Sequence, residues 1–151
     1  MSPNNTIAKT VDWFNIARPA PNAAQTRVQL GVHFEEVVEM LLEISSPNEI
    51  TDKLLRDACF AMNILAYNLK AYESVIHYKS HINILDSICD QIVTATGVAH
   101  HLGYSVVGAL DEVNASNFSK FENGEAIVDV NGKIAKGCDY FKPDLSAFVP
   151  T

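Results

Sequence analysis

The sequence predicts an all-α fold: an antiparallel helical bundle of about four to five helices, then a short C-terminal β-hairpin and an extended tail. Up to residue 121, apolar residues recur at helical spacing in long segments joined by short connections, as in antiparallel bundles. Beyond it the pattern changes to Gly, Pro and short β-type runs. We expect one domain over residues 1–151, with the helical core at about 10–121 and the hairpin and tail at 122–151.

The composition limits the classes of partner. The chain has 151 residues, is 48% hydrophobic and carries a formal net charge of -7. This acidic balance argues against nucleic acid or an anionic membrane surface as the main partner, although a metal ion can still bridge acidic side chains to a nucleotide. The three cysteines form no CxxC pair, and no apolar run reaches transmembrane length. We expect a cytoplasmic protein without disulfides.

The first element is a short amphipathic stretch, Thr10 to Ile16, followed by a Pro-rich connection over residues 18–25. It carries two adjacent aromatic residues, Trp13 and Phe14. Either they cover the core, or they offer a flat surface on which a nucleobase stacks.

The second element, Val28 to Ile44, is an acidic helix. Glu36, Glu39 and Glu43 share one stripe, and the segment contains no Lys or Arg. Two carboxylates about 4 Å apart repel by roughly 4 kcal/mol at an effective dielectric constant near 20. The stripe is therefore either a solvated acidic face or part of a site for a hard metal ion.

The third helix is expected from about Pro47 to Tyr78, with Ser46 as N-cap and Glu49 at the third helical position. Its heptad-like apolar stripe predicts a packing spine that extends into a subunit interface. Cys59 is interpreted as a small buried hydrophobic residue on that spine.

The fourth helix, residues 82–103, carries Asp86 and Asp90 one turn apart on an otherwise apolar helix. Aspartate is a poor residue for a helix interior, so the pair calls for a reason. Gly103 is predicted to end the helix in the left-handed conformation. His100 and His101 are interpreted as residues of the last turn and not as metal ligands.

The fifth helix is expected from Val106 to about Phe121, with Val107, Leu110 and Val113 facing inward. A type I′ hairpin is predicted beyond it from Asn131-Gly132, between strands at Ala126–Val130 and Lys133–Ala135. The tail should be extended and anchored by three aromatic residues, Tyr140, Phe141 and Phe148.

In an antiparallel bundle the two acidic helices can face each other, so that their carboxylates converge. Oxygen ligands without cysteine or histidine favour Mg²⁺ or Mn²⁺ over zinc. A di-iron site is disfavoured because the Glu-x-x-His pattern is missing, and no glycine-rich phosphate loop occurs.

Two motifs, EEVVE at residues 35–39 and DSICD at 86–90, resemble the acidic signature of the all-α nucleoside triphosphate pyrophosphohydrolases, the MazG-like superfamily. Its pattern is Glu-x-x-Glu, then Glu-x-x-Asp on a later helix. Glu36 and Glu39 match the first pair and Asp90 matches the final aspartate. Ser87 stands in the place of the usual glutamate, and Asp86 precedes it.

Three further segments share this resemblance and extend it over most of the chain. Asp-Trp-Phe at 12–14 is similar to deoxycytidine-triphosphatase-type members, in which an aromatic residue holds the base. EVNASNFSKF at 112–121 resembles the Asn- and Lys-bearing last helix. NGKIAKGCDYFKPDL at 131–145 is similar to the end of small phage and bacterial members of the phosphoribosyl-ATP pyrophosphohydrolase-like type.

The resemblance implies hydrolysis of a nucleoside triphosphate to the monophosphate and pyrophosphate, in the cytoplasm of a bacterial or phage-infected cell. Glu35 or Glu36 is then the catalytic residue that orients the attacking water. The implied Mg²⁺ ligands are Glu36, Glu39, Asp86 and Asp90. The implied substrate-binding residues are Trp13, Phe14, Asn117, Lys120 and Lys136.

Two alternatives stay open. Within the superfamily, the substrate could be phosphoribosyl-ATP instead of an ordinary NTP or dNTP. Outside it, the chain could be a non-catalytic helical interaction protein whose acidic stripe is a solvated face. Members of the superfamily work as homodimers or homotetramers, so a second copy of the chain is the expected macromolecular partner, with no nucleic acid and no membrane.

Overall fold

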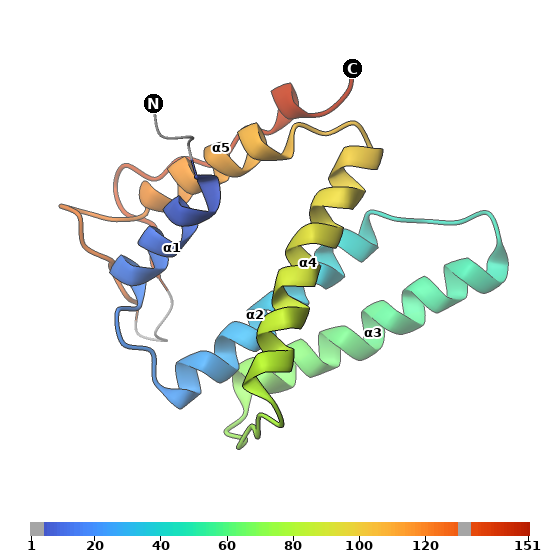
Figure 1. Cartoon of the computed structure of the whole chain (residues 1–151), viewed down its shortest axis with the longest axis horizontal. Helices are drawn as coiled ribbons and strands as arrows, with labels where there is room; N and C mark the ends of the chain where they lie inside the picture. Colours follow the sequence, from blue (N-terminus) through green and yellow to red (C-terminus); the bar gives the residue numbers. More distant parts are fainter. Residues whose placement is uncertain (1–4, 130–133) are drawn as a thin grey trace. The chain divides into compact units, whose positions relative to one another are not determined.

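Helix caps in the sequence mark where most of the helices begin. The side chains of Asn5, Asn22, Asn48 and Ser80 each accept a backbone N–H in the first turn that follows, which satisfies a donor that has no partner within the helix. A computed structural model describes residues 5–129 and 134–151 (Figure 1). Its elements are α1 (Thr6–Ala17), α2 (Ala23–Leu42), α3 (Glu49–Ala71), α4 (His81–His101), α5 (Val106–Phe118) and the 3₁₀ turn η1 (Ser146–Phe148).

The all-α prediction is confirmed, but some helix ends differ from those expected from the sequence. α3 is capped by Asn48, because the Ser46 hydroxyl instead accepts the backbone N–H of Asn48, 3.2 Å away. α3 also ends at Ala71, seven residues before the expected Tyr78. Gly103 has φ 76° just after α4, so the predicted left-handed stop is present.

The predicted C-terminal β-hairpin is wrong for the part of the chain that the structure describes. Around Asn131-Gly132, which lies outside the described residues, only an isolated antiparallel bridge forms between Val128 and Ile134, and no strand is assigned. A second bridge joins Glu122 to Glu125 across Asn123-Gly124, where both central residues have positive φ. A tight turn is therefore present at Asn123-Gly124, but neither bridge extends into a strand within the described residues.

The chain divides into two units. The two-helix unit is Pro21–Tyr78 and contains α2 and α3. The terminal unit is formed by Met1–Ala20 with Lys79–Thr151, and its described elements are α1, α4, α5 and η1. None of the described helices is both long enough and apolar enough to cross a membrane.

In the two-helix unit, α2 and α3 pack as an antiparallel hairpin. Its buried residues include Val38, Cys59 and Ala66, so the prediction that Cys59 is buried is confirmed. The buried Arg27 guanidinium donates to the backbone carbonyl of Leu69, one of the last carbonyls of α3. These carbonyls lack helical partners and carry the negative end of the helix dipole, which explains why a cation is stable there.

In the terminal unit, α5 is the central helix, because two other segments pack along it. α1 runs parallel to α5: Lys9 Nζ lies 2.8 Å from Asp111 Oδ1, and Thr10 Oγ1 donates to Asn114 Oδ1 at 2.9 Å. Residues 134–150, the C-terminal strap, run antiparallel to α5. Ser116 Oγ donates to the carbonyl of Phe141 at 2.7 Å, and Ser105 N donates to the carbonyl of Phe148 at 2.9 Å.

α4 differs from the other helices because none of its residues is buried. Its large apolar side chains are all at least 45% exposed apart from the half-buried Ile84. Those exposed residues are Ile82, Leu85, Ile88, Ile92, Val93 and Val98. An apolar helix of this kind is ordinarily covered by a partner surface.

The close approach of α2 and α3 depends on Gly31, which has no side chain. A Cβ atom there would lie 2.8 Å from the carbonyl oxygen of Ala66 and 3.1 Å from Leu69 Cβ. We therefore expect Gly31→Ala to push the helices apart and lower the free energy of unfolding by about 1–3 kcal/mol, measured by urea denaturation.

Gly97→Ala is the matched control, because a Cβ atom at Gly97 in α4 meets nothing within 4 Å. Alanine favours a helix interior over glycine by about 0.8–1 kcal/mol, so this change should raise the free energy of unfolding. Equal effects of the two substitutions would contradict the close contact assigned to Gly31.

Candidate functional site

Trp13 and the C-terminal end of α5 form the best-defined cluster of predicted site residues. The indole Nε1–H of Trp13 donates to the backbone carbonyl of Asn117 at 2.9 Å. Phe121 stacks on the indole ring, with ring centroids 5.7 Å apart and an interplanar angle of 9°. The α1–α5 packing thus brings together residues that lie 104 positions apart in the sequence.

Lys120 completes this cluster just beyond the end of α5. Its Nζ donates to Asn117 Oδ1 at 2.7 Å and lies 5.9 Å from the centroid of the Trp13 ring, within the range of a cation–π contact. An ammonium group near a helix C-terminus is also favoured by the helix dipole. Trp13, Asn117 and Lys120 therefore form one contiguous group, which we call the Trp13–Lys120 cluster.

The other two predicted substrate-binding residues take different positions. Phe14 packs against Trp13 in a T-shaped pair, with ring centroids 5.0 Å apart and an interplanar angle of 85°, and remains 38% exposed. Lys136, on the strap, places its Nζ 4.5 Å from the centroid of the Tyr140 ring. The strap is attached to the cluster through the backbone, since Gly137 N donates to the carbonyl of Lys120 at 3.1 Å.

Glu35 on α2 is paired with a cation that sequence reasoning missed. The Nζ of Lys70, in the last turn of α3, forms an ion pair with Glu35 Oε1. The absence of Lys and Arg from residues 28–44 is real, but the compensating charge comes from the neighbouring helix. Only the antiparallel pairing of α2 and α3 reveals it.

Glu36 and Glu39 on α2, and Glu43 just after it, are exposed. On α4, Asp86 and Asp90 are exposed as well. Among the described residues, the side chains of Glu39, Asp86 and Asp90 have no ion pair and no hydrogen bond. These three exposed carboxylates are therefore accessible to a cation.

The predicted metal ligands are distributed over both units. Glu36 and Glu39 belong to the two-helix unit, whereas Asp86 and Asp90 belong to the terminal unit. Within residues 5–129 and 134–151, no three His, Cys, Asp or Glu side chains are gathered closely enough to hold a metal ion. The donor chemistry still fits Mg²⁺, because all four side chains offer carboxylate oxygens. The four-ligand site stays a prediction.

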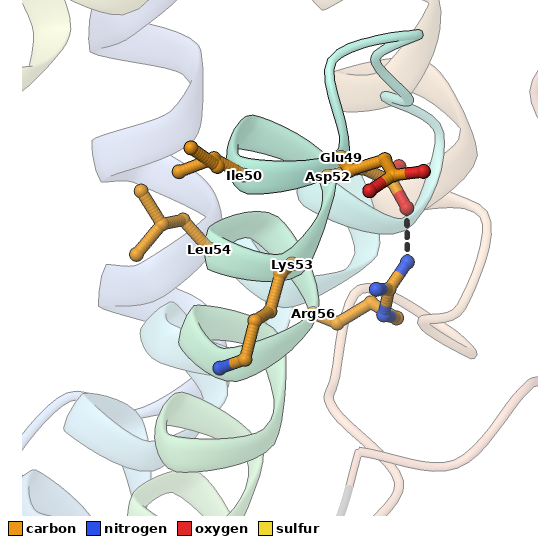
Figure 2. Close-up of a pocket in the computed structure, with 6 residues that line it drawn as sticks. All are labelled: Glu49, Ile50, Asp52, Lys53, Leu54 and Arg56. Carbon is orange, nitrogen blue, oxygen red and sulfur yellow. Dashed lines mark hydrogen bonds and ion pairs between the residues drawn. The ribbon is translucent and has the colours of Figure 1, made fainter.

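A pocket at the start of α3 contains none of the predicted site residues (Figure 2). Three of its charged side chains are paired on the same helix: Arg56 with Asp52, and Lys53 with Asp57. These exposed pairs four residues apart are typical of a solvated helix surface. The lining residues are Glu49, Ile50, Asp52, Lys53, Leu54 and Arg56.

Acidic groups surround Cys138 on the strap. Glu122 Oε1 accepts the backbone N–H of Cys138 at 2.8 Å, and Asp139 is the next residue. The negative charges of Asp139 and, to a lesser extent, Glu122 raise the pKa of the exposed Cys138 thiol. This thiol is therefore a weaker candidate for a nucleophile than an ordinary exposed cysteine.

The raised pKa of Cys138 predicts its reactivity. At pH 8 a smaller fraction of the thiol is ionised, so alkylation by iodoacetamide should be slow. Asp139→Asn should lower the pKa and increase the rate at Cys138, measured by peptide mass spectrometry. Exposed Cys89 in the same molecule is the internal control, and its rate should not change. An unchanged rate at Cys138 would contradict the electrostatic cause.

No protein-family model, curated protein or solved structure matches this chain. The motifs EEVVE and DSICD, together with the last-helix and tail segments, thus remain the basis of the resemblance described above. Two groups of residues could bind a ligand or a metal ion: the Trp13–Lys120 cluster, and the exposed carboxylates of α2 and α4.

Proposed function

We propose that the chain is a Mg²⁺-dependent nucleoside triphosphate pyrophosphohydrolase, which converts an NTP or dNTP and water to the monophosphate and pyrophosphate. The observation that carries the proposal is the Trp13–Lys120 cluster. The resemblance implied phosphate-binding roles for Asn117 and Lys120 and a base-binding role for Trp13 and Phe14. In the folded terminal unit Trp13 contacts the other three residues.

Lys120 is suited to bind a phosphate group. Its ammonium group has three N–H donors, and Asn117 Oδ1 accepts only one of them. Phe14 suits the base better than Trp13 does. Phe121 covers one face of the Trp13 ring, whereas Phe14 keeps 38% of its surface exposed. Lys136 could add a second positive charge, since the strap joins it to the backbone of Lys120.

The metal ligands in this proposal are Glu36, Glu39, Asp86 and Asp90. Mg²⁺ held there would supply the positive charge that phosphoryl transfer requires. The support is chemical: three of these side chains, Glu39, Asp86 and Asp90, are exposed carboxylates without a cationic partner among the described residues. The proposal requires the four carboxylates to converge on one ion, within one chain or across a homodimer or homotetramer.

A carboxylate would orient the water that attacks the α-phosphorus, and the bond to the β-phosphate oxygen would break to release pyrophosphate. Glu35 and Glu36 are the two candidates. Glu35 is half-buried beside Lys70, whereas Glu36 is exposed, so Glu36 is more accessible to a substrate and is the better choice. The pair of Glu35 with Lys70 then has a supporting role, because it fixes the turn of α2 that carries Glu36.

The non-catalytic alternative is favoured by a different observation, the exposed apolar side chains of α4. A helical interaction protein would use this surface for a partner, and its acidic stripes would only be solvated faces. Phosphoribosyl-ATP remains the alternative substrate within the enzymatic proposal. Measurements of turnover and of metal binding separate the three.

The eight common NTPs and dNTPs, with phosphoribosyl-ATP, should be incubated with the protein and Mg²⁺, and pyrophosphate, orthophosphate and monophosphate measured separately. We expect pyrophosphate release, reduced by at least about a hundredfold in Glu39→Gln, because metal charge stabilisation is worth several kcal/mol. Glu73→Gln, in the exposed segment after α3, is the matched control and should keep full activity. Release of orthophosphate alone would contradict the reaction class.

Magnesium binding should also stabilise the folded protein. A ligand at tenfold its Kd adds about 1.4 kcal/mol to the free energy of unfolding, which raises the Tm by about 3–6 °C for a chain of this length. Asp90→Asn should weaken the shift, and Glu73→Gln should retain it. A Tm that Mg²⁺ does not change, together with no turnover, would favour the non-catalytic alternative.

A further inference from the structure

The indole of Trp13 is occupied on several sides by the protein itself. Its N–H donates to the carbonyl of Asn117, one face is stacked by Phe121, and Phe14 forms a T-shaped pair with it. A base-stacking platform needs an open face, as in proteins that bind single nucleobases. Trp13 is only half-buried, but its contacts are those of a residue that holds other residues in place.

The residue that Trp13 positions is Lys120. The Nζ of Lys120 lies against the indole ring, and Asn117 anchors it through its side-chain oxygen. The backbone carbonyl of Asn117 in turn accepts two donors, the Trp13 indole at 2.9 Å and the Lys120 backbone N–H at 3.2 Å. Trp13 therefore contacts both the charged end of Lys120 and the peptide group that fixes its backbone.

This arrangement matters because of the electrostatics at the end of α5. The last carbonyls of a helix carry a partial negative charge, which attracts an ammonium group and repels an anion. If the ammonium group of this lysine donated to these carbonyls, fewer of its N–H donors would remain for a ligand. The indole face gives the ammonium an alternative partner that uses none of its N–H donors, so the donors stay available for a phosphate oxygen.

We infer that Trp13 is a positioning residue that acts through Lys120: it holds the ammonium group in place to bind a phosphate group, and it does not stack on the base. The inference rests on the proposed function for its substrate, a polyphosphate. It differs from that proposal in assigning Trp13 to the phosphate end of the ligand.

Trp13 is the only tryptophan in the chain, so intrinsic fluorescence reports on this one side chain. Inorganic pyrophosphate is the probe, because it offers phosphate without a base. We expect it to change the fluorescence of the wild-type protein, and Lys120→Gln to abolish that change. Lys142→Gln removes an exposed charge elsewhere on the strap and should leave the change intact. A response that survives Lys120→Gln would overturn the inference.

Calorimetric titration with pyrophosphate tests whether an aromatic ring is needed at position 13 or only a side chain of sufficient size. Trp13→Phe keeps an aromatic face and should bind within about threefold of wild type, whereas Trp13→Leu should bind about tenfold more weakly. Equal affinities of the two variants would overturn the inference. If Trp13→Leu does not fold, as judged by circular dichroism, the fluorescence comparison of Lys120→Gln with wild type decides alone.

A nucleoside without phosphates distinguishes the two roles of Trp13. Deoxycytidine and deoxyadenosine should leave the fluorescence unchanged; a response as large as that to pyrophosphate would make Trp13 a base platform. A different result would show that the proposed function fails while the inference holds. No nucleotide would then be turned over, but pyrophosphate would still bind in a way that depends on Lys120.

Discussion

The buried amide of Asn114 is the interaction on which the geometry of the terminal unit depends. Its Nδ2 donates to the carbonyl of Thr6 at 3.0 Å, and its Oδ1 accepts from the Thr10 hydroxyl. A buried amide left without partners costs about 1–3 kcal/mol, so other registers of α1 against α5 are disfavoured. One turn further along both helices, this register places the Trp13 indole on the Asn117 carbonyl. The cluster with Lys120 follows from it.

The two-helix unit depends on a different constraint, the close approach of backbones at Gly31. Because α3 passes so near to α2 there, Lys70 can reach Glu35 and Arg27 can reach the end of α3. Lys70 and Arg27 thus both lie toward the end of the hairpin where α3 finishes. Glu39, in the last turns of α2, and Glu43, just after the helix, have no basic partner among the described residues, which keeps their face acidic.

Helical periodicity predicted all five helices, because the spacing of apolar residues is a local property of the sequence. Helix ends were less well predicted, since the competition between Asn48 and Ser46 is decided by one hydrogen bond. The predicted C-terminal hairpin was wrong for the described residues, because a turn-forming sequence does not by itself supply strand pairing. For the site, the sequence indicated Trp13, Asn117 and Lys120 as separate residues, but their mutual contacts and the role of Lys70 come from tertiary packing. The four metal ligands stay a prediction.

The position of α5 has a consequence for how the chain folds during synthesis. α1 leaves the ribosome early, yet its hydrogen-bonding partners on α5 lie more than 100 residues later. Meanwhile α2 and α3 follow each other directly and need only each other to form their hairpin. Contacts between residues close in sequence form faster than contacts between residues far apart in sequence. The α2–α3 hairpin can therefore fold before α5 is available to pack against α1. During that interval the incomplete chain exposes the side of α1 that later packs on α5, and transiently exposed apolar surface favours aggregation.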